Sequence, residues 1–232
     1  MGRPSFLADP RHGPLPALLL VLTFVSGVVD AISILSVGRV FVANMTGNVV
    51  FIGFALAGVE GFSLSASLIA VAGFIVGALS GGRLIDRFGQ SRPVLLRNCV
   101  AVESVLLGGC LVISLVVHLR QGGPVASTVV AGIAAAAMGL QTATARRIGV
   151  PDMTTSVVTM TLTGFAADHR NATEAAIRRG AVVVSMLLGA LVGAVLVLRI
   201  GSHAGFIAVL VLLVIVGTFS THLARRTAPW HS

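Results

Sequence analysis

Long apolar runs alternate with short polar stretches along the chain. Six runs are about 20 residues or longer, the length that a helix needs to cross a hydrocarbon core of about 30 Å. These six runs are 15–37, 64–85, 94–118, 124–145, 180–199 and 203–223. Two shorter apolar runs, 44–59 and 153–167, each open with a polar motif. The pattern predicts an all-α polytopic membrane protein, with a transmembrane domain over 15–223 between tails at 1–14 and 224–232.

The composition is too apolar for a water-soluble protein. Of the 232 residues, 56% are hydrophobic and 10% are charged, whereas soluble domains carry about 25% charged residues. The net charge of +8 would suggest nucleic acid as a partner if the basic residues gathered on one face. All sixteen are arginines, and nearly all lie between the apolar runs. This placement is typical of charges that orient a membrane protein, so the expected partner is the lipid bilayer and not nucleic acid.

The arginines also favour one of two topologies. Eight crossings would put eight arginines on each side of the membrane. Six crossings, with 44–59 and 153–167 each entering and leaving on the same side, put thirteen arginines on one side and three on the other. Cytoplasmic loops carry an excess of basic residues. We therefore expect six spans, two re-entrant segments and cytoplasmic termini, with full crossing by the two short segments as the alternative.

Patterns in the first half of the chain recur in the second half. The polar motif Val42–Val50 has a second copy at Val150–Val158. The pattern predicts two three-helix repeats, about 15–118 and about 124–223, each with one short broken helix. An odd number of spans in each repeat makes the two halves inverted, which is a recurrent plan of transporters. Chance similarity between apolar sequences is the alternative explanation.

Small residues are spaced for close helix packing in both halves. Successive members of each set are four positions apart, and the two sets lie 112 residues apart: Gly73, Gly77 and Gly81 in the first, and Ser185, Gly189 and Gly193 in the second. Such small residues let membrane helices approach one another closely. We expect them to pack the two repeats together first, and to support a homodimer second.

The two polar motifs are the best candidates for a substrate site. Their polar members are Asn44, Thr46 and Asn48 in the first copy, and Asp152, Thr154 and Ser156 in the second. Non-helical backbone inside a membrane is tolerated only against protein or water. A half-helix that starts at such a motif would point free N–H groups into a cavity. The alternative is that these side chains only cap two short helices.

Two carboxylates fall within the predicted spans. Glu103 lies nine residues into its span, roughly 14 Å deep at 1.5 Å per residue. It is the candidate for a proton- or cation-coupling group, and the alternative is a structural acid bonded to a neighbouring helix. Asp30 lies nearer the outer end of its span, where we expect a structural ion pair with Arg39. Gln141 and Thr142, in the fourth predicted span, are weaker candidates for a functional role.

Enzymatic chemistry has little support in the sequence. No Ser/His/Asp set, metal-ligand cluster or phosphate-binding loop occurs, so no catalytic residue, metal or cofactor is expected. Cys99 and Cys110 both fall in one apolar run and are expected to be inert buried thiols.

The run Gly27–Ser33 followed by Gly38–Gly58, which contains Ala-Asn-Met-Thr-Gly-Asn, resembles the YoaK-type family of uncharacterised bacterial membrane proteins. The resemblance covers nearly the whole chain. It implies six spans in the bacterial inner membrane and no settled activity.

A second, local likeness concerns Gly82–Arg92. It is similar to the cytoplasmic loop motif of major-facilitator transporters, although Gln90 stands where that motif has a basic residue. The likeness implies a gating loop with Asp86 and Arg87. A plain charged loop is the alternative.

The preferred function is a transporter or channel for a small solute, with the site between the repeats at the paired polar motifs. The alternative is a non-transporting membrane scaffold or interaction protein. A polar cavity that water can reach would support transport, and a dry, tightly packed core would support the scaffold.

Overall fold

Each of the six long apolar runs forms one continuous helix. The computed structural model describes residues 12–117, 123–150 and 172–225. Six helices in this part of the chain are long and apolar enough to cross a membrane. They are α1 (Leu15–Ser36), α3 (Leu64–Phe88), α4 (Arg92–Val116), α5 (Gly123–Ile148), α7 (Ala172–Arg199) and α8 (Ser202–Ala224). The all-α class and the six spans are therefore confirmed.

The shorter apolar run at 44–59 forms α2 (Met45–Leu56). Its 12 residues rise about 18 Å at 1.5 Å per residue, which is too short for a full crossing. The other short run, 153–167, lies outside the described residues.

Local chemistry in the sequence explains where several helices begin. The Ser63 side chain accepts a hydrogen bond from the backbone N–H of Ala66, 3.2 Å away, and so caps the start of α3. Pro93 lies in the first turn of α4, where its missing N–H costs no helical hydrogen bond. Gly201 separates α7 from α8 with φ at +136°, which L side chains rarely adopt. These breaks keep successive spans as separate helices.

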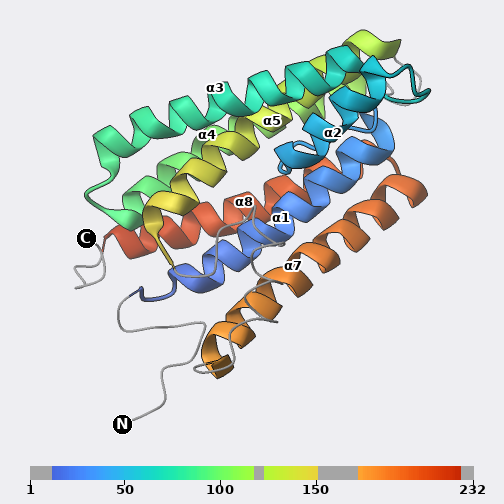
Figure 1. The fold of residues 1–232 in the computed structure, drawn as a ribbon. Helices are drawn as coiled ribbons and strands as arrows, with labels where there is room; N and C mark the ends of the chain where they lie inside the picture. The colour runs from blue at the N-terminus through green and yellow to red at the C-terminus, as the bar shows by residue number, and fades with distance from the viewer. Residues whose placement is uncertain (1–11, 118–122, 151–171, 226–232) are drawn as a thin grey trace.

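The arginines gather at one end of the bundle. Figure 1 shows that the starts of α1, α4 and α7 lie at the same end as the finishes of α3, α5 and α8. Nine of the eleven arginines in the described ranges belong to these helix ends, namely Arg83, Arg87, Arg92, Arg97, Arg146, Arg147, Arg178, Arg179 and Arg225. Only Arg39 and Arg199 among them belong to the other end. We name the two ends the arginine-rich end and the arginine-poor end.

Glycines bring α3 and α5 into backbone contact. A Cβ atom added to Gly77 would collide with the carbonyl oxygen of Ala136, and one added to Gly139 would collide with that of Phe74. No larger residue fits at either position while the two helices keep this separation. The small residues therefore serve packing within one chain, as the sequence predicts.

The same contacts recur between α1 and α7, each 112 residues away along the sequence. Gly189 corresponds to Gly77, and its added Cβ would meet the carbonyl oxygen of Phe24, the counterpart of Ala136. Gly27 corresponds to Gly139, and its added Cβ would meet the carbonyl oxygen of Met186. Thus α7 of the second half packs against α1 of the first half in the same way as α3 of the first half packs against α5 of the second. The inverted orientation of the two halves stays a prediction.

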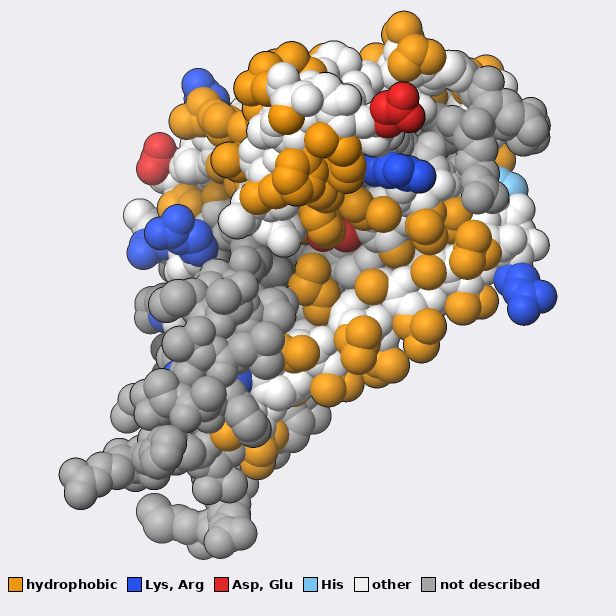
Figure 2. Space-filling model, turned by 45° about the vertical axis from the view of Figure 1, so that its right-hand side comes forward, with side chains coloured by type: hydrophobic (Ala, Val, Ile, Leu, Met, Phe, Trp, Pro, Cys, Tyr) orange, Lys and Arg blue, Asp and Glu red, His pale blue; other side chains and the backbone are white. Residues whose placement is uncertain are grey.

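The outward faces of the bundle are apolar. Large hydrophobic side chains with at least half of their area exposed occur on α3, α4, α7 and α8, for example Leu79, Val105, Leu187 and Val214. In Figure 2, hydrophobic side chains are spread over much of the described surface on the face in view, and charged side chains lie among them in the upper part of the view. Such a surface suits contact with lipid chains rather than water.

Candidate functional site

The segment between α1 and α2 turns back into the bundle. We call residues 37–44 the inserted loop. The backbone N–H groups of Val42 and Ala43 both donate to Oδ1 of Asp30, each over 2.9 Å. Asp30 lies six residues before the end of α1, so these amides lie roughly 9 Å inside that end, at 1.5 Å per residue. The expected ion pair of Asp30 with Arg39 is wrong: in this structure the carboxylate binds the backbone of the inserted loop.

Asn48 holds the same loop from the first turns of α2. The N–H of Phe41 donates to Oδ1 of Asn48 over 2.9 Å, and Nδ2 of Asn48 donates to the carbonyl oxygen of Phe41 over 2.6 Å. The ring of Phe41 also lies against Gly47, where an added Cβ would collide with it. Backbone polar groups at this depth need partners from protein. Asp30 and Asn48 together supply them for three consecutive residues of the loop.

Aromatic packing completes this element. The ring of Phe51 on α2 stacks on Phe41 of the inserted loop with centroids 5.6 Å apart. It also packs against Phe62, just before α3, at 4.8 Å. Stacked and tilted aromatic pairs stabilise packing beyond their area alone. The inserted loop and α2 therefore form one packed unit that enters and leaves at the arginine-poor end.

The predicted site residues of the first motif have different environments. Asn48 is fully buried and engaged with Phe41, so it serves the loop itself. Asn44 occupies the cap position of α2, but its side chain makes no capping hydrogen bond. Thr46 is exposed. Asp152, Thr154 and Ser156 of the second motif lie outside the described residues.

Polar groups also lie deeper in the bundle, where α5 packs against both α1 and α4. Nε2 of Gln141 on α5 donates to Oγ of Ser26 on α1 over 2.9 Å. The Ser26 hydroxyl donates in turn to the carbonyl oxygen of Leu22 over 3.1 Å. Oε1 of Gln141 is buried and has no hydrogen-bond partner within the described ranges. We name Ser26, Cys99, Glu103, Gln141 and Thr144 the interior polar cluster.

Glu103 is the acidic member of the interior polar cluster. Its side chain is fully buried, and neither carboxyl oxygen has a hydrogen-bond partner in the part of the chain that is described. Cys99 lies one turn before it on α4, and the thiol faces both Glu103 and the side chain of Thr144. A carboxyl group in a membrane span is costly and marks a functional site by default. The structure therefore keeps Glu103 as the candidate coupling residue.

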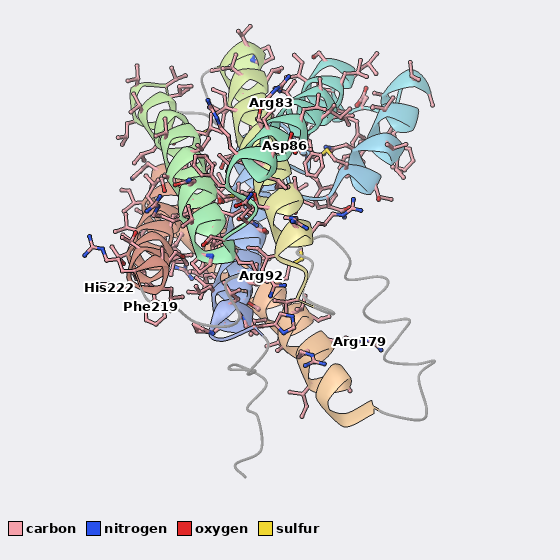
Figure 3. The ribbon with its side chains drawn as sticks, turned by 90° about the vertical axis from the view of Figure 1, so that its left-hand side faces the viewer. Arg83, Asp86, Arg92, Arg179, Phe219 and His222 are labelled. Carbon is pink, nitrogen blue, oxygen red and sulfur yellow. The ribbon has the colours of Figure 1, made fainter. Side chains whose placement is uncertain are left out.

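Asp86 and Arg87 lie in the last turn of α3 and not in a loop. The connection to α4 consists of residues 89–91 only. Both side chains are exposed at the arginine-rich end. Figure 3 shows Asp86 beside Arg83 on α3, with Arg92, Arg179 and His222 contributed by α4, α7 and α8. The expected loop is thus wrong as secondary structure, while the gating role stays a prediction.

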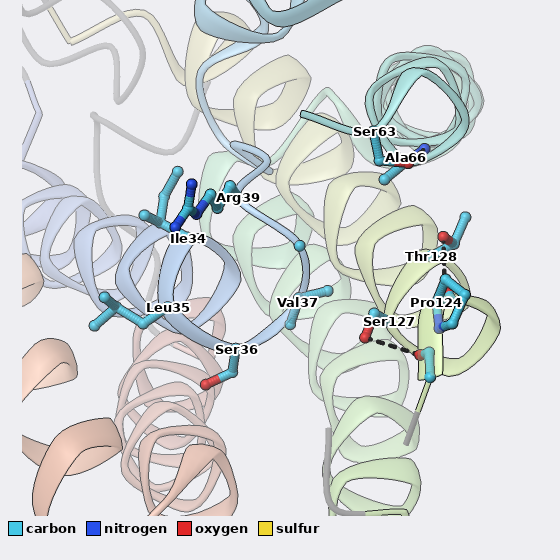
Figure 4. A pocket seen from close by; sticks show the side chains of 12 residues that line it. Ile34, Leu35, Ser36, Val37, Arg39, Ser63, Ala66, Pro124, Ser127 and Thr128 are labelled. Carbon is cyan, nitrogen blue, oxygen red and sulfur yellow. Dashed lines mark hydrogen bonds between the residues drawn. The ribbon is translucent and has the colours of Figure 1, made fainter. Parts of the chain in front are cut away.

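A cavity opens at the arginine-poor end. Its volume is about 500 Å³. The turn after α1, the start of α3 and the start of α5 line it, with Ser36, Arg39, Ser63, Ser127 and Thr128 as the polar residues (Figure 4). The hydroxyls of Ser127 and Thr128 donate to carbonyl oxygens of their own helix. None of the predicted site residues within the described ranges lines this cavity.

Sequence reasoning missed a polar face of α1 that leads away from this cavity. Its residues are Ser26, Asp30, Ser33 and Ser36, and all four are buried. Their spacing of four, three and three residues places them on one side of a helix. This spacing is visible in the sequence, so it could have been found.

Cys99 and Cys110 are free and buried, as expected from the sequence. Among the described residues, no group of three or more His, Cys, Asp and Glu side chains could hold a metal ion.

A comparison with known proteins found a relative but no solved counterpart. The chain is 31% identical over 152 residues to a protein of Bacillus subtilis (strain 168) described as "UPF0700 transmembrane protein YoaK". This alignment covers 65% of each chain, so it spans slightly less than two thirds of the relative's length. No solved structure matches the chain.

The family resemblance is confirmed over most of the sequence. A family profile described as "Protein of unknown function (DUF1275)" matches residues 18–218, which include all six spans in whole or in large part. The described fold and the transmembrane relative agree on a multi-pass membrane protein. The chain therefore belongs to the family described as "Protein of unknown function (DUF1275)".

Proposed function

We propose that the protein is a transporter or channel for a small solute in the bacterial inner membrane. The solute passes between the two repeats, and Glu103 couples its movement to a proton or cation. Asn44 and Thr46 of the first motif, together with Asp152, Thr154 and Ser156 of the second, contribute to the site. Asn48 holds the loop that presents the first motif.

The observation that carries this proposal is the carboxyl group of Glu103 in the middle of α4, which is fully buried and has no hydrogen-bond partner among the described residues. A protein that only has to fill its interior would keep an apolar residue there, because a lone buried acid is costly. Oε1 of Gln141 adds a further buried polar atom without a partner in the described chain. An interior that retains such groups is better explained by a passing solute or ion than by packing.

Two further features support a site between the repeats. The inserted loop is non-helical backbone at membrane depth, as in the broken helices of transporters. The matched glycine contacts of α3 with α5 and of α7 with α1 support a pseudo-symmetric packing of two halves. Inverted halves would bring the second motif to the first from the other side of the membrane.

The test places cysteines at Thr46 and Thr154 in a Cys99→Ala, Cys110→Ala background. Both positions should react with small polar thiol reagents, and a short crosslinker should join them. Helix caps at opposite membrane surfaces would be about 30 Å apart and would react without joining. Reaction at neither position would indicate a dry core and favour a scaffold protein.

The proposed orientation puts both termini in the cytoplasm, because the arginine-rich end holds the start of α1 and the finish of α8. Reporter fusions after Ser232 and at Gly122 check it. A reporter after Ser232 that is active only outside the cytoplasm would exclude the six-span topology.

A further inference from the structure

One face of α1 carries a row of buried polar side chains. Ser26, Asp30, Ser33 and Ser36 follow one another at four, three and three residues and so lie along a single stripe. The opposite side of the helix packs on α7, where Ala31 contacts the Gly193 position. α1 thus has one side closed by tight packing and one polar side that faces the bundle interior.

Most of the polar atoms on this stripe are not used by the protein itself. The hydroxyls of Ser33 and Ser36 and Oδ2 of Asp30 have no hydrogen-bond partner in the described residues. The three side chains are only 2%, 6% and 5% exposed. Buried polar groups in proteins almost always have a partner, either protein or water. A row of three without one points to a ligand outside the chain.

The stripe is continuous with the cavity at its outer end and with the interior polar cluster at its inner end. Ser36 belongs to both the stripe and the cavity lining. At the other end, Ser26 accepts the hydrogen bond from Gln141. The four residues from Ser36 to Ser26 extend about 15 Å, at 1.5 Å for each of ten residues. They connect the arginine-poor end with the middle of the bundle.

We infer that the cavity is the mouth of a hydrated path, which follows the polar stripe of α1 to Gln141 and admits small uncharged solutes that donate hydrogen bonds. This inference rests on the proposed function and names its entry route and its solute class.

Charged and polar groups at two levels of the path favour an uncharged solute. At the mouth, Arg39 is exposed and has no acidic partner among the described residues, and the first turns of α3 and α5 add their positive helix ends. These groups oppose a cation. Deeper in, Oδ2 of Asp30 and Oε1 of Gln141 are acceptors without a partner among the described residues, and they oppose an anion, while the hydroxyls of Ser33 and Ser36 can donate or accept. Hydroxyl- or amide-bearing solutes such as polyols and urea satisfy both conditions.

The path is tested by cysteine accessibility in the Cys99→Ala, Cys110→Ala background, on protein in lipid nanodiscs. Ser33→Cys should react with 2-hydroxyethyl methanethiosulfonate roughly tenfold faster than the control Ala31→Cys, because a thiol must be hydrated to ionise. Ala31 lies two residues away at nearly the same depth and is less buried than Ser33. If the bundle interior is dry, the less buried Ala31→Cys should react faster than Ser33→Cys. Equal or slower reaction of Ser33→Cys would overturn the path.

The solute class is tested by stopped-flow light scattering of vesicles that contain the full-length protein. Glycerol and urea should equilibrate faster than in empty vesicles, whereas potassium and acetate should not. Ser33→Leu should slow both uncharged solutes, and Ser36→Leu at the mouth gives a second variant should the first not fold. Hydration of the stripe without glycerol or urea flux would overturn the solute class alone. Crosslinking of the Thr46 and Thr154 positions tests the proposed function separately.

Discussion

Two groups of buried polar residues in this bundle differ in how well the chain itself satisfies them. Around the inserted loop, Asp30 of α1 and Asn48 of α2 engage the loop backbone at Phe41, Val42 and Ala43 in four hydrogen bonds. In the interior polar cluster, both oxygens of Glu103 and Oε1 of Gln141 have no hydrogen-bond partner among the described residues.

The difference separates polar atoms that hold the chain's own structure from polar atoms that are available for a solute. A satisfied polar group specifies one conformation of the chain, whereas an unsatisfied one costs free energy unless something else binds it. We therefore expect substitutions in the inserted loop to lower stability. Substitutions in the interior polar cluster should spare stability and change activity.

Asp30→Ala should give the largest effect on stability. It leaves the buried N–H groups of Val42 and Ala43 without an acceptor, at about 1–3 kcal/mol for each group. Asp30→Asn keeps an oxygen at the Oδ1 position and should lose much less. Unfolding in detergent can be followed with a thiol-reactive dye, since Cys99 and Cys110 are both buried and free. Equal midpoints for the Ala and Asn variants would show that the loop does not depend on this acceptor.

Gly77→Ala should lower stability by about 1–3 kcal/mol, since overpacking forces helices apart. Its new Cβ would meet the carbonyl oxygen of Ala136, whereas the matched control Gly82→Ala on the same helix has open space. The corresponding pair in the second half, Gly189→Ala and Gly180→Ala, should behave in the same way. If only one half shows the contrast, the two packing interfaces are not equivalent in the folded protein.

Gly47→Ala should have a smaller cost, about 1 kcal/mol, because its Cβ meets the Phe41 ring and a side chain can move more easily than backbone. Gly53→Ala, also on α2, meets nothing within 4 Å and should be neutral or slightly stabilising. The same dye assay compares them. A neutral Gly47→Ala would mean that the ring of Phe41 is not fixed against α2.

The sequence predicted the spans well because a membrane helix is determined by local composition. All six runs became helices with ends within a few residues of the prediction, apart from α7, which begins eight residues earlier. The re-entrant character of the first short segment also follows from its length and from the arginine balance. These features need no knowledge of which helices touch.

The partners of individual side chains, in contrast, depend on which helices touch, and the sequence pattern does not show this. Asp30 has Arg39 nearby in sequence, yet the chain folds back and presents the N–H groups of Val42 and Ala43 instead. Asn48 was grouped with Asn44 and Thr46 as a site residue because the three share one motif. Only the contact with Phe41 distinguishes it as structural. A motif in sequence thus combines residues that support a loop with residues that the loop presents.

Glu103→Gln should have the smallest effect on stability of the four substitutions and a large effect on activity. Gln has nearly the same size and carries no ionisable group. Because the carboxyl oxygens have no hydrogen-bond partner among the described residues, the exchange removes no identified bond. The unfolding midpoint should stay unchanged or rise, within about 1 kcal/mol, since a lone buried acid is itself unfavourable.

Proton movement in vesicles decides the functional half of this prediction. An imposed pH gradient, with the potential clamped by potassium and valinomycin, should collapse faster with the wild-type protein than in empty vesicles, as reported by trapped pyranine. Glu103→Gln should lose this acceleration, while Glu60→Gln, exposed at the arginine-poor end, should keep it. A variant that keeps wild-type flux would exclude Glu103 as the coupling residue. A variant that fails to accumulate would make the acid structural, and the contrast between the inserted loop and the interior polar cluster would then no longer hold.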